Sequence, residues 1–326
     1  MARVFIDGFE AGSVKLWDLI DNATAVAPVS GMDGSYCLDI NALGEYAQKT
    51  VPEKSEYYAA FLYQCTQSTN LCNIIAFRNG TTVLGWVRFV SGSSIRAYRG
   101  SGISNVLADG ATPLIHNTTY LIEVRYKPHS TGVFQVKVNG LLEIDYSGNT
   151  TPGAATITNI RLAYYGVTPY YGAAYYDNFI LDDADWPGNT KIQAIVPTGA
   201  GNSTQWTPSA GANYECVDEV PPSEADYVAT NTIGHLDQFA AGNLVGTIGS
   251  VKCVQVQALA KTDGAPTPTN LQLAVRSGSA DYLSGDKAVP SASKQLWNLW
   301  ETDPATAAAW SESGVNAMEI GVKAVA

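Results

Sequence analysis

The chain has 326 residues, which is more than one ordinary domain needs and enough for two. Hydrophobic residues make up 46% of the sequence and charged residues 15%, so apolar cores can form and a disordered chain is excluded. The net charge of -11, without any run of Lys and Arg, argues against nucleic-acid binding, because such binding gathers cations against phosphates.

The residue types favour β structure. The sequence contains 18 Tyr and 30 Gly; Tyr and Thr suit half-buried pleated surfaces, whereas Gly and Pro interrupt them. The N-terminal MARVFIDGFEAGS lacks the apolar stretch of a signal peptide, and no segment approaches the ~20 apolar residues that span a bilayer. We therefore expect a soluble all-β protein that is made in the cytoplasm.

Residues 1–185 alternate with period two in one segment after another. In LIEVRYK (121–127), apolar residues face one way and charged residues the other, which predicts a strand with one buried face. Asn139-Gly140 lies between two such runs and predicts a type I′ hairpin. A two-sheet sandwich follows from these patterns. Further strands are predicted at 35–40, 56–64, 73–80, 83–90, 94–100, 158–166 and 175–183.

The order of FIDGFEAG near the start, the VFQVKVNG hairpin and the closing YYDNFILDD resembles the concanavalin A-like (laminin G-like) jelly roll over about residues 1–183. That family includes lectin-like binders, glycoside hydrolases and structural modules, so the resemblance implies a fold and no particular function. Hydrolases of this fold carry E-x-D-x-x-E on one strand. Here Glu143 and Asp145 are followed by Gly148 in place of the last Glu. We expect no catalytic site, and we expect these two carboxylates on the solvated face of a hairpin.

A group of tyrosines surrounds the turn GVTPYYGAA and forms the candidate binding surface. Exposed aromatic rings stack on sugars or fill protein interfaces. Alternate tyrosines of a strand can equally cover the edge and core of a sandwich, and both alternatives stay open here. The candidate residues are Tyr164, Tyr165, Tyr170, Tyr171, Tyr175 and Tyr176.

No metal site, cofactor or catalytic constellation is predicted. The three histidines are far apart, and none of the five cysteines forms a CxxC pair. Cys65 and Cys72 can face each other across a hairpin, either as a disulfide or as thiols, and cytoplasmic synthesis favours thiols. Relatives of the jelly roll often hold calcium, but the oxygen donors in this chain match no calcium-loop signature. Those donors are Asp177, Asn178, Asp182 and Asp183.

The second half, residues 186–326, again shows alternating segments, at 250–260, 270–278 and 316–325. KIQAIVPT (191–198) is expected to open a strand. GAGNST (199–204) lacks the G-K-[ST] ending of a phosphate loop and is expected to be an ordinary loop. Asp303-Pro304 predicts the start of one short helix over 305–310.

The predicted fold class is therefore all-β, with two β-sandwich (jelly-roll) domains in tandem, residues 1–185 and 186–326, and at most one short helix in the second. Trp186-Pro187 is the predicted joint. Pro187 restricts Trp186 to extended conformations, and the indole can pack into a flanking sandwich. We expect a fixed angle between the domains.

Several motifs of the second half, in order, resemble a module of tailed-bacteriophage virion structural proteins over about residues 180–326. They are DDADWPG, IQAIVPTGAGNSTQWTPS, VQVQALAKTDG, LQLAVRSG, ETDPATAAAW and NAMEIGVKAV. The resemblance implies a non-enzymatic virion protein, foremost a head decoration protein, with a tail fibre or a glycan-binding receptor component as the alternative. It also implies a location on the virion, partners among capsid or tail proteins, a homo-oligomer such as a trimer, and in the alternative a host surface glycan. No cofactor, nucleic-acid partner or membrane partner is expected.

Overall fold

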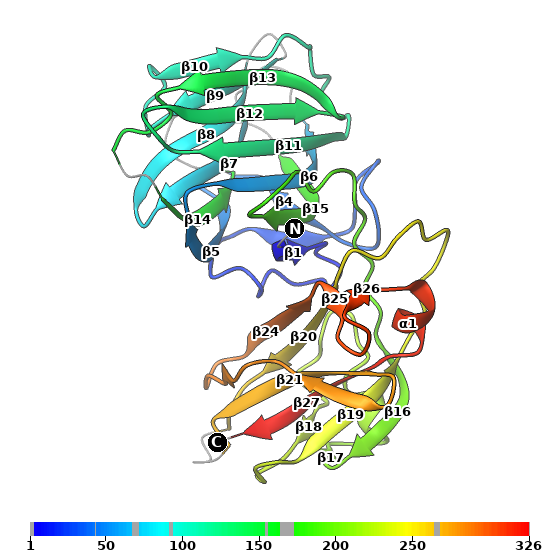
Figure 1. Ribbon diagram of the computed structural model, residues 1–326. Coiled ribbons are helices and arrows are strands. Elements are labelled where there is room, and N and C mark those ends of the chain that lie inside the picture. Colours follow the sequence, from blue (N-terminus) through cyan, green and yellow to red (C-terminus); the bar gives the residue numbers. More distant parts are fainter. Residues whose placement is uncertain are drawn as a thin grey trace. The chain divides into compact units, whose positions relative to one another are not determined.

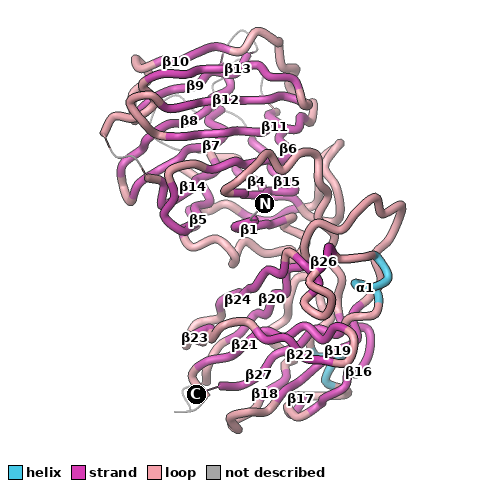
Figure 2. Tube along the Cα trace, viewed as in Figure 1, coloured by secondary structure: helices cyan, strands magenta, loops and turns pink. Residues whose placement is uncertain are grey.

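The computed structural model describes residues 3–42, 44–66, 72–90, 94–153, 156–163, 173–263 and 268–325. Strands dominate these residues, and the chain divides into two compact units, residues 1–192 and 193–326 (Figures 1 and 2). The predicted fold class, an all-β chain of jelly-roll type, is confirmed. Within the described part of the chain, no helix is long and apolar enough to cross a membrane.

The first unit is a sandwich of two antiparallel sheets. Sheet A has the strand order β13-β12-β11-β6-β15-β4-β3, and β1 pairs with β15 as well. Sequence neighbours β11, β12 and β13 form a meander, whereas β6 and β15 lie at the centre and bring distant segments together. Its strands are β1 (Arg3–Asp7), β3 (Thr24–Val26), β4 (Cys37–Ile40), β6 (Tyr57–Cys65), β11 (Tyr120–Lys127), β12 (Gly132–Val138), β13 (Leu141–Gly148) and β15 (Ala174–Asp182).

Sheet B has the order β10-β9-β8-β7-β14-β5-β2. The central strand β14 pairs with β5 on one side and with β7 on the other, although the three lie far apart in the sequence. Its strands are β2 (Leu19–Asp21), β5 (Tyr46–Lys54), β7 (Cys72–Asn79), β8 (Thr82–Val90), β9 (Ser94–Arg99), β10 (Val106–Asp109) and β14 (Ile157–Leu162).

The core of the first unit lies between the two sheets. Phe77 of sheet B packs on Tyr126 of sheet A with ring centroids 5.0 Å apart. A Cβ atom on Gly85 would come within 2.7 Å of the Tyr126 ring, so the backbone of β8 approaches that ring closely. The predicted hairpin between β12 and β13 is present, with positive φ at both Asn139 (49°) and Gly140 (82°). These contacts identify the inward face of each strand.

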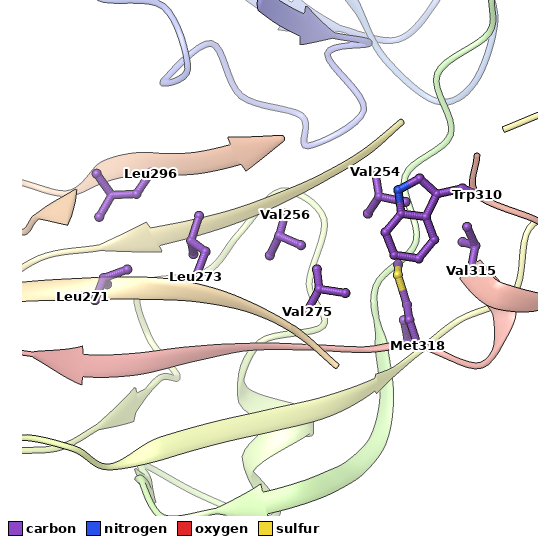
Figure 3. Packing of buried hydrophobic residues seen from close by; sticks show 10 residues of the cluster. Val254, Val256, Leu271, Leu273, Val275, Leu296, Trp310, Val315 and Met318 are labelled. Carbon is purple, nitrogen blue, oxygen red and sulfur yellow. The ribbon is translucent and has the colours of Figure 1, made fainter. Parts of the chain in front are cut away.

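The second unit has two layers. Sheet C has the order β16-β19-β27-β21-β22, with β23 also paired to β21, and a β20–β24 ribbon lies against it. Figure 3 shows the core between them, where Val256 of the ribbon faces Leu273 and Val275 of sheet C. Small pairs complete the unit: β17 (Thr207–Pro208) with β18 (Val228–Ala229), and β25 (Thr302–Asp303) with β26 (Ala308–Ala309). The other strands are β16 (Pro197–Thr204), β19 (Leu236–Ala241), β20 (Val254–Ala260), β21 (Asn270–Ser277), β22 (Ala280–Leu283), β23 (Lys287–Ala288), β24 (Lys294–Trp300) and β27 (Glu319–Val325).

The helix predicted at 305–310 is wrong. The side chain of Asp303 accepts hydrogen bonds from Ser277 Oγ (2.6 Å) and from Ala305 N (3.0 Å), which closes a turn instead of starting a helix. The short helix is α1 (Glu312–Asn316), and its N-cap Ser311 accepts a hydrogen bond from the backbone of Gly314. A 3₁₀ turn, η1 (Asn213–Cys216), also lies in this unit.

The expected loop at 199–204 is also wrong, because GAGNST belongs to strand β16 and pairs with β19. Gly201 is required for packing, because a Cβ atom there would lie 2.6 Å from the backbone carbon of Gln238. A strand that crosses its neighbour this closely has no room for a side chain. The strand expected from residue 191 begins later, at Pro197.

The predicted joint packs on the first sandwich. The Trp186 indole meets the Tyr58 ring edge-on with centroids 5.6 Å apart, and the Lys137 ammonium lies 3.8 Å from the indole centroid. The backbone of Gly188 donates to Glu123 Oε1 at 3.2 Å. We call residues 186–192 the strap; the division at residue 192 places it with the first unit and not with the second.

Candidate binding face on sheet B

The outer face of sheet B, turned away from sheet A, carries the candidate site. Residues directly opposite each other in an antiparallel pair lie on the same face. Since Phe77 and Gly85 pair with each other and point to sheet A, the neighbouring pair Ala76 and Trp86 points outward. The same row continues through Arg161 and Gln48 on one side and through Tyr98 on the other.

This face gathers arginines in an otherwise acidic chain. Four of the eight arginines in the sequence lie on it, one on each of four strands, at alternating positions among apolar residues. Because each strand contributes so few, the sequence shows no basic run, and only the pairing of the strands brings the cations together. The four are Arg78, Arg88, Arg96 and Arg161.

Two of these arginines converge on one amide oxygen. Arg78 Nη1 donates to Gln48 Oε1 at 2.8 Å, and Arg161 Nε donates to the same oxygen at 3.0 Å. A guanidinium group can only donate hydrogen bonds, so the atom between the two must be the amide oxygen. The Gln48 Nε2 group then points elsewhere, and no described residue accepts from it. We call Arg78, Gln48 and Arg161 the arginine–glutamine cluster.

Aromatic rings border this cluster. The Arg161 guanidinium carbon lies 3.8 Å from the centroid of Tyr46, a cation–π contact. Further along the face, Trp86 and Tyr98 stack with centroids 4.1 Å apart and planes 9° apart, and both are buried. Tyr46, Gln48 and Arg161 are half-buried, whereas Arg78 is buried, so Gln48 and Arg161 are the accessible part of the cluster.

Two carboxylates lie on the face, one toward each edge: by register, the exposed Asp21 of β2 is opposite Tyr46, and Asp109 of β10 is opposite Arg96. Asp109 of β10 is paired with Arg96 of β9 by register and by an ion pair, with Arg96 Nη2 3.0 Å from Asp109 Oδ2. Gln48, the partner that Arg78 and Arg161 share, is by contrast a neutral amide. Gln48 itself therefore adds no negative charge beside Arg78 and Arg161.

The predicted tyrosine surface is not assembled as one cluster by the described residues. Tyr176 is fully buried and its hydroxyl donates to the Ile74 carbonyl at 2.9 Å, so it is a core residue and no exposed ring. Tyr175, its neighbour on β15, is half-buried and points the opposite way. Tyr164, Tyr165, Tyr170 and Tyr171 lie outside the described residues.

Of the two hairpin carboxylates expected on a solvated face, Asp145 is exposed, whereas Glu143 is half-buried. Glu143 accepts hydrogen bonds from the backbone of Ala111 (3.0 Å) and of Thr112 (2.9 Å), so it fixes a neighbouring loop instead of facing water alone. Partial burial acts to raise the pKa of Glu143, but the hydrogen bonds outweigh it and the pKa is lowered. Asp145 accepts from Gln135 Nε2 at 2.7 Å. Neither arrangement resembles a paired acid and nucleophile.

Metal ligands and cysteines give no further site. In the described ranges, no three or more His, Cys, Asp or Glu side chains gather as metal ligands would. Asp177, Asn178 and Asp182 instead accept or donate hydrogen bonds within the first unit, and Asp183 pairs with Lys54. The Cys72 side chain lies outside the described residues, and so does any pairing with Cys65.

No family model and no curated protein matches the chain. Among solved structures, the chain is similar to an endo-β-1,4-glucuronan lyase from the fungus Trichoderma reesei, at 15% identity and a TM-score of 0.41, over 56% of this chain and 96% of the lyase. It is similar to the carbohydrate-binding module CBM66 from Bacillus subtilis, at 10% identity and a TM-score of 0.35, over 51% of this chain and 94% of the module. A sialidase is matched at 15% identity and a TM-score of 0.40, over 56% of this chain but 19% of the sialidase.

These solved structures are carbohydrate-active proteins rather than virion proteins. The prediction of a non-enzymatic virion structural protein, whether head decoration protein or tail fibre, is therefore wrong, and so is the prediction that the chain is no enzyme. The resemblance of residues 180–326 to a phage module, with its virion location, stays an untested prediction. A jelly-roll sandwich is the fold that the comparison supports.

Proposed function

We propose that the chain recognises an acidic polysaccharide on the outer face of sheet B. The observation that carries the proposal is the arginine–glutamine cluster, in which Arg78 and Arg161 both donate to Gln48 Oε1. Two like charges held this close repel each other, and an anion that binds beside them relieves that repulsion. The amide hydrogens of Gln48 donate to no described residue and are left for the ligand.

The shape and chemistry of the surface around the cluster favour an extended polymer as the ligand. A sheet face offers an extended surface, and Tyr46 offers a ring beside Arg161. The jelly-roll sandwich is a fold that carbohydrate-binding proteins use. Planar guanidinium groups match the two oxygens of a carboxylate, so a uronate-containing chain suits this face better than a neutral one.

Affinity electrophoresis of Arg161→Gln in gels that contain alginate, pectate or hydroxyethyl cellulose tests the proposal. We expect wild type to be retarded by at least one acidic polymer, more weakly at high salt because the attraction is screened. Arg161→Gln should bind at least about tenfold more weakly, since a lost charge-assisted hydrogen bond costs about 1.5–3 kcal/mol. Arg99→Gln is the matched control, because Arg99 pairs with the inward-facing Gly85 and donates to Asn149 O off this face. Equal retardation of Arg161→Gln and wild type would exclude the proposed role.

Cleavage of the same polymer is the second candidate, favoured by the position of Tyr46. In β-elimination a base removes the proton next to the uronate carboxylate, the electrons form a carbon–carbon double bond, and the glycosidic oxygen leaves. Groups that neutralise the carboxylate lower the barrier, because negative charge develops there. Tyr46 lies against Arg161 and is the proton carrier nearest to the arginine–glutamine cluster that the described contacts identify.

Ultraviolet absorbance of the unsaturated product measures this activity directly. If the chain is a lyase, wild type generates the absorbance from an acidic polymer, and Tyr46→Phe retains binding but loses at least a hundredfold in rate, the usual contribution of acid–base catalysis. A wild-type protein that binds the polymer without any absorbance change leaves recognition as the function and removes cleavage.

A further inference from the structure

A second group of polar side chains lies on the outer face of the other sheet, on the neighbouring strands β6, β15 and β4. Tyr176 points inward to the core, so its neighbour Tyr175 points outward from sheet A. By register, Tyr175 lies between Asp39 of β4 and Gln64 of β6, and Thr24 of β3 continues the row beyond Asp39. Side chains directly opposite on one face have Cβ atoms about 5 Å apart, so the three are in reach of one ligand.

The amide of Gln64 is oriented with its oxygen available. Its Nε2 group donates to the Ser30 carbonyl at 3.0 Å and to Thr119 Oγ1 at 3.2 Å. Thr119 Oγ1 itself donates to the same Ser30 carbonyl at 2.9 Å. Both amide hydrogens are thereby used, and a carbonyl partner requires the nitrogen at that position. No described residue donates to Gln64 Oε1, so it remains an acceptor.

Asp39 supplies a second acceptor. Its Oδ2 accepts from Asn41 Nδ2 at 2.7 Å, whereas Oδ1 is buried and receives no hydrogen bond from the described residues. Asp39 is 8% exposed, and an unsatisfied buried acceptor costs about 1–3 kcal/mol. Asn41, the donor to Oδ2, is itself exposed.

We infer that Asp39, Tyr175 and Gln64 form a binding site for a neutral sugar, separate from the arginine–glutamine cluster. The ring of Tyr175 offers a flat apolar surface with a hydroxyl at its tip, as sugar-stacking rings do. The flanking oxygens of Asp39 and Gln64 accept hydrogen bonds, and sugar hydroxyl groups donate them. A carboxylate in the row repels uronates, so the two faces select opposite ligands: anions on sheet B and uncharged hydroxyl-rich chains on sheet A.

The test uses the full chain and a panel of neutral polymers, hydroxyethyl cellulose, dextran and galactomannan, in affinity electrophoresis. We expect at least one polymer to retard wild type. Asp39→Asn and Tyr175→Leu should each weaken that retardation about tenfold, equivalent to about 1.4 kcal/mol. Arg161→Gln should leave it unchanged, which separates this site from the proposed function. Conversely, Asp39→Asn should bind acidic polymers as wild type does, whereas Arg161→Gln should bind them more weakly.

Three results would overturn the inference. The first is that no neutral polymer retards wild type. The second is that both variants bind the polymer as wild type does while their thermal unfolding shows them folded. The third is that calcium chloride raises the melting temperature of wild type but not of Asp39→Asn, because the acceptor oxygens would then serve a cation.

Discussion

At the scale of single residues, two carboxyl groups buried in the first sandwich stand out. Asp7 accepts hydrogen bonds from Phe9 N (2.8 Å) and Trp17 Nε1 (2.9 Å). Burial raises its pKa to about 7, although these donors and the nearby Lys49 act to lower it, while Glu10 adds to the rise. The folded state therefore holds a proton there that the unfolded chain releases at lower pH.

Asp177 is the second buried carboxyl group with a raised pKa. Its oxygens accept from Asp33 N (2.7 Å) and Asn178 N (2.6 Å), and burial raises its pKa to about 7, with Glu10 and Asp33 adding to the rise. A carboxyl group whose folded pKa lies above its unfolded value of 3.8 stabilises the fold at low pH. That stabilisation is complete below the unfolded pKa and is lost as the pH rises through about 7.

We expect the melting temperature of the first unit to fall by several degrees between about pH 5 and about pH 8, because ~1 kcal/mol shifts it by about 2–4 °C at this size. Asp177→Asn removes one of the two titrating groups and should make the fall shallower. Differential scanning calorimetry across that pH range measures both. A melting temperature that rises with pH in wild type would contradict the expectation.

At the scale of elements, strand β16 depends on one of its glycines more than on another. A Cβ atom at Gly201 would lie 2.6 Å from the Gln238 backbone, whereas the nearest atom to a Cβ at Gly199 is Ala240 Cβ at 3.8 Å. Gly201→Ala should destabilise the second unit by about 1–3 kcal/mol through overpacking. The matched variant Gly199→Ala should stay within about 0.5 kcal/mol of wild type. Chemical denaturation compares them, and equal stabilities would show that β16 has room to move.

Four segments, β16 among them, show where the prediction of elements from the sequence succeeds and where it fails. The pair Asn139-Gly140 needs positive φ locally, and the alternation through Met318 and Ala324 marks one apolar face, so both were predictable. GAGNST gives no such signal, because Gly201 is required by the close approach of the Gln238 backbone, which is distant in the sequence. Asp303 likewise has the type of a helix cap, but Ser277 on another strand fixes its side chain in a turn.

At the scale of the whole molecule, the candidate site on sheet B was hidden from sequence reasoning. Gln48, Arg78 and Arg161 come from three strands that are adjacent in the sheet and separate in the chain. Considered alone, each arginine is an ordinary polar residue of an alternating strand and does not indicate a binding site. The order of strands, and not any local motif, creates the cluster. The fold class was accessible because periodicity is local, whereas this site depends on register.

The strap also changes where the first domain ends. A fragment of residues 1–185 lacks the Trp186–Tyr58 contact and the hydrogen bond from Gly188 to Glu123, whereas a fragment of residues 1–192 keeps both. We expect the longer fragment to melt several degrees higher, since these contacts together are worth about 1–3 kcal/mol. Thermal unfolding followed by tryptophan fluorescence compares them. Identical melting temperatures would mean that the strap contributes nothing to the sandwich.

The strap has a mechanical consequence as well. Ile192 N donates to Asn178 Oδ1 at 2.8 Å, so the chain is tied to the centre of β15 at the point where it leaves the first unit. A pulling force applied through residue 193 loads this hydrogen bond first, then the hydrogen bond at Gly188 and the indole of Trp186, and last the strand itself. We expect these contacts to break one after another, before the backbone hydrogen bonds that β15 makes with its neighbouring strands.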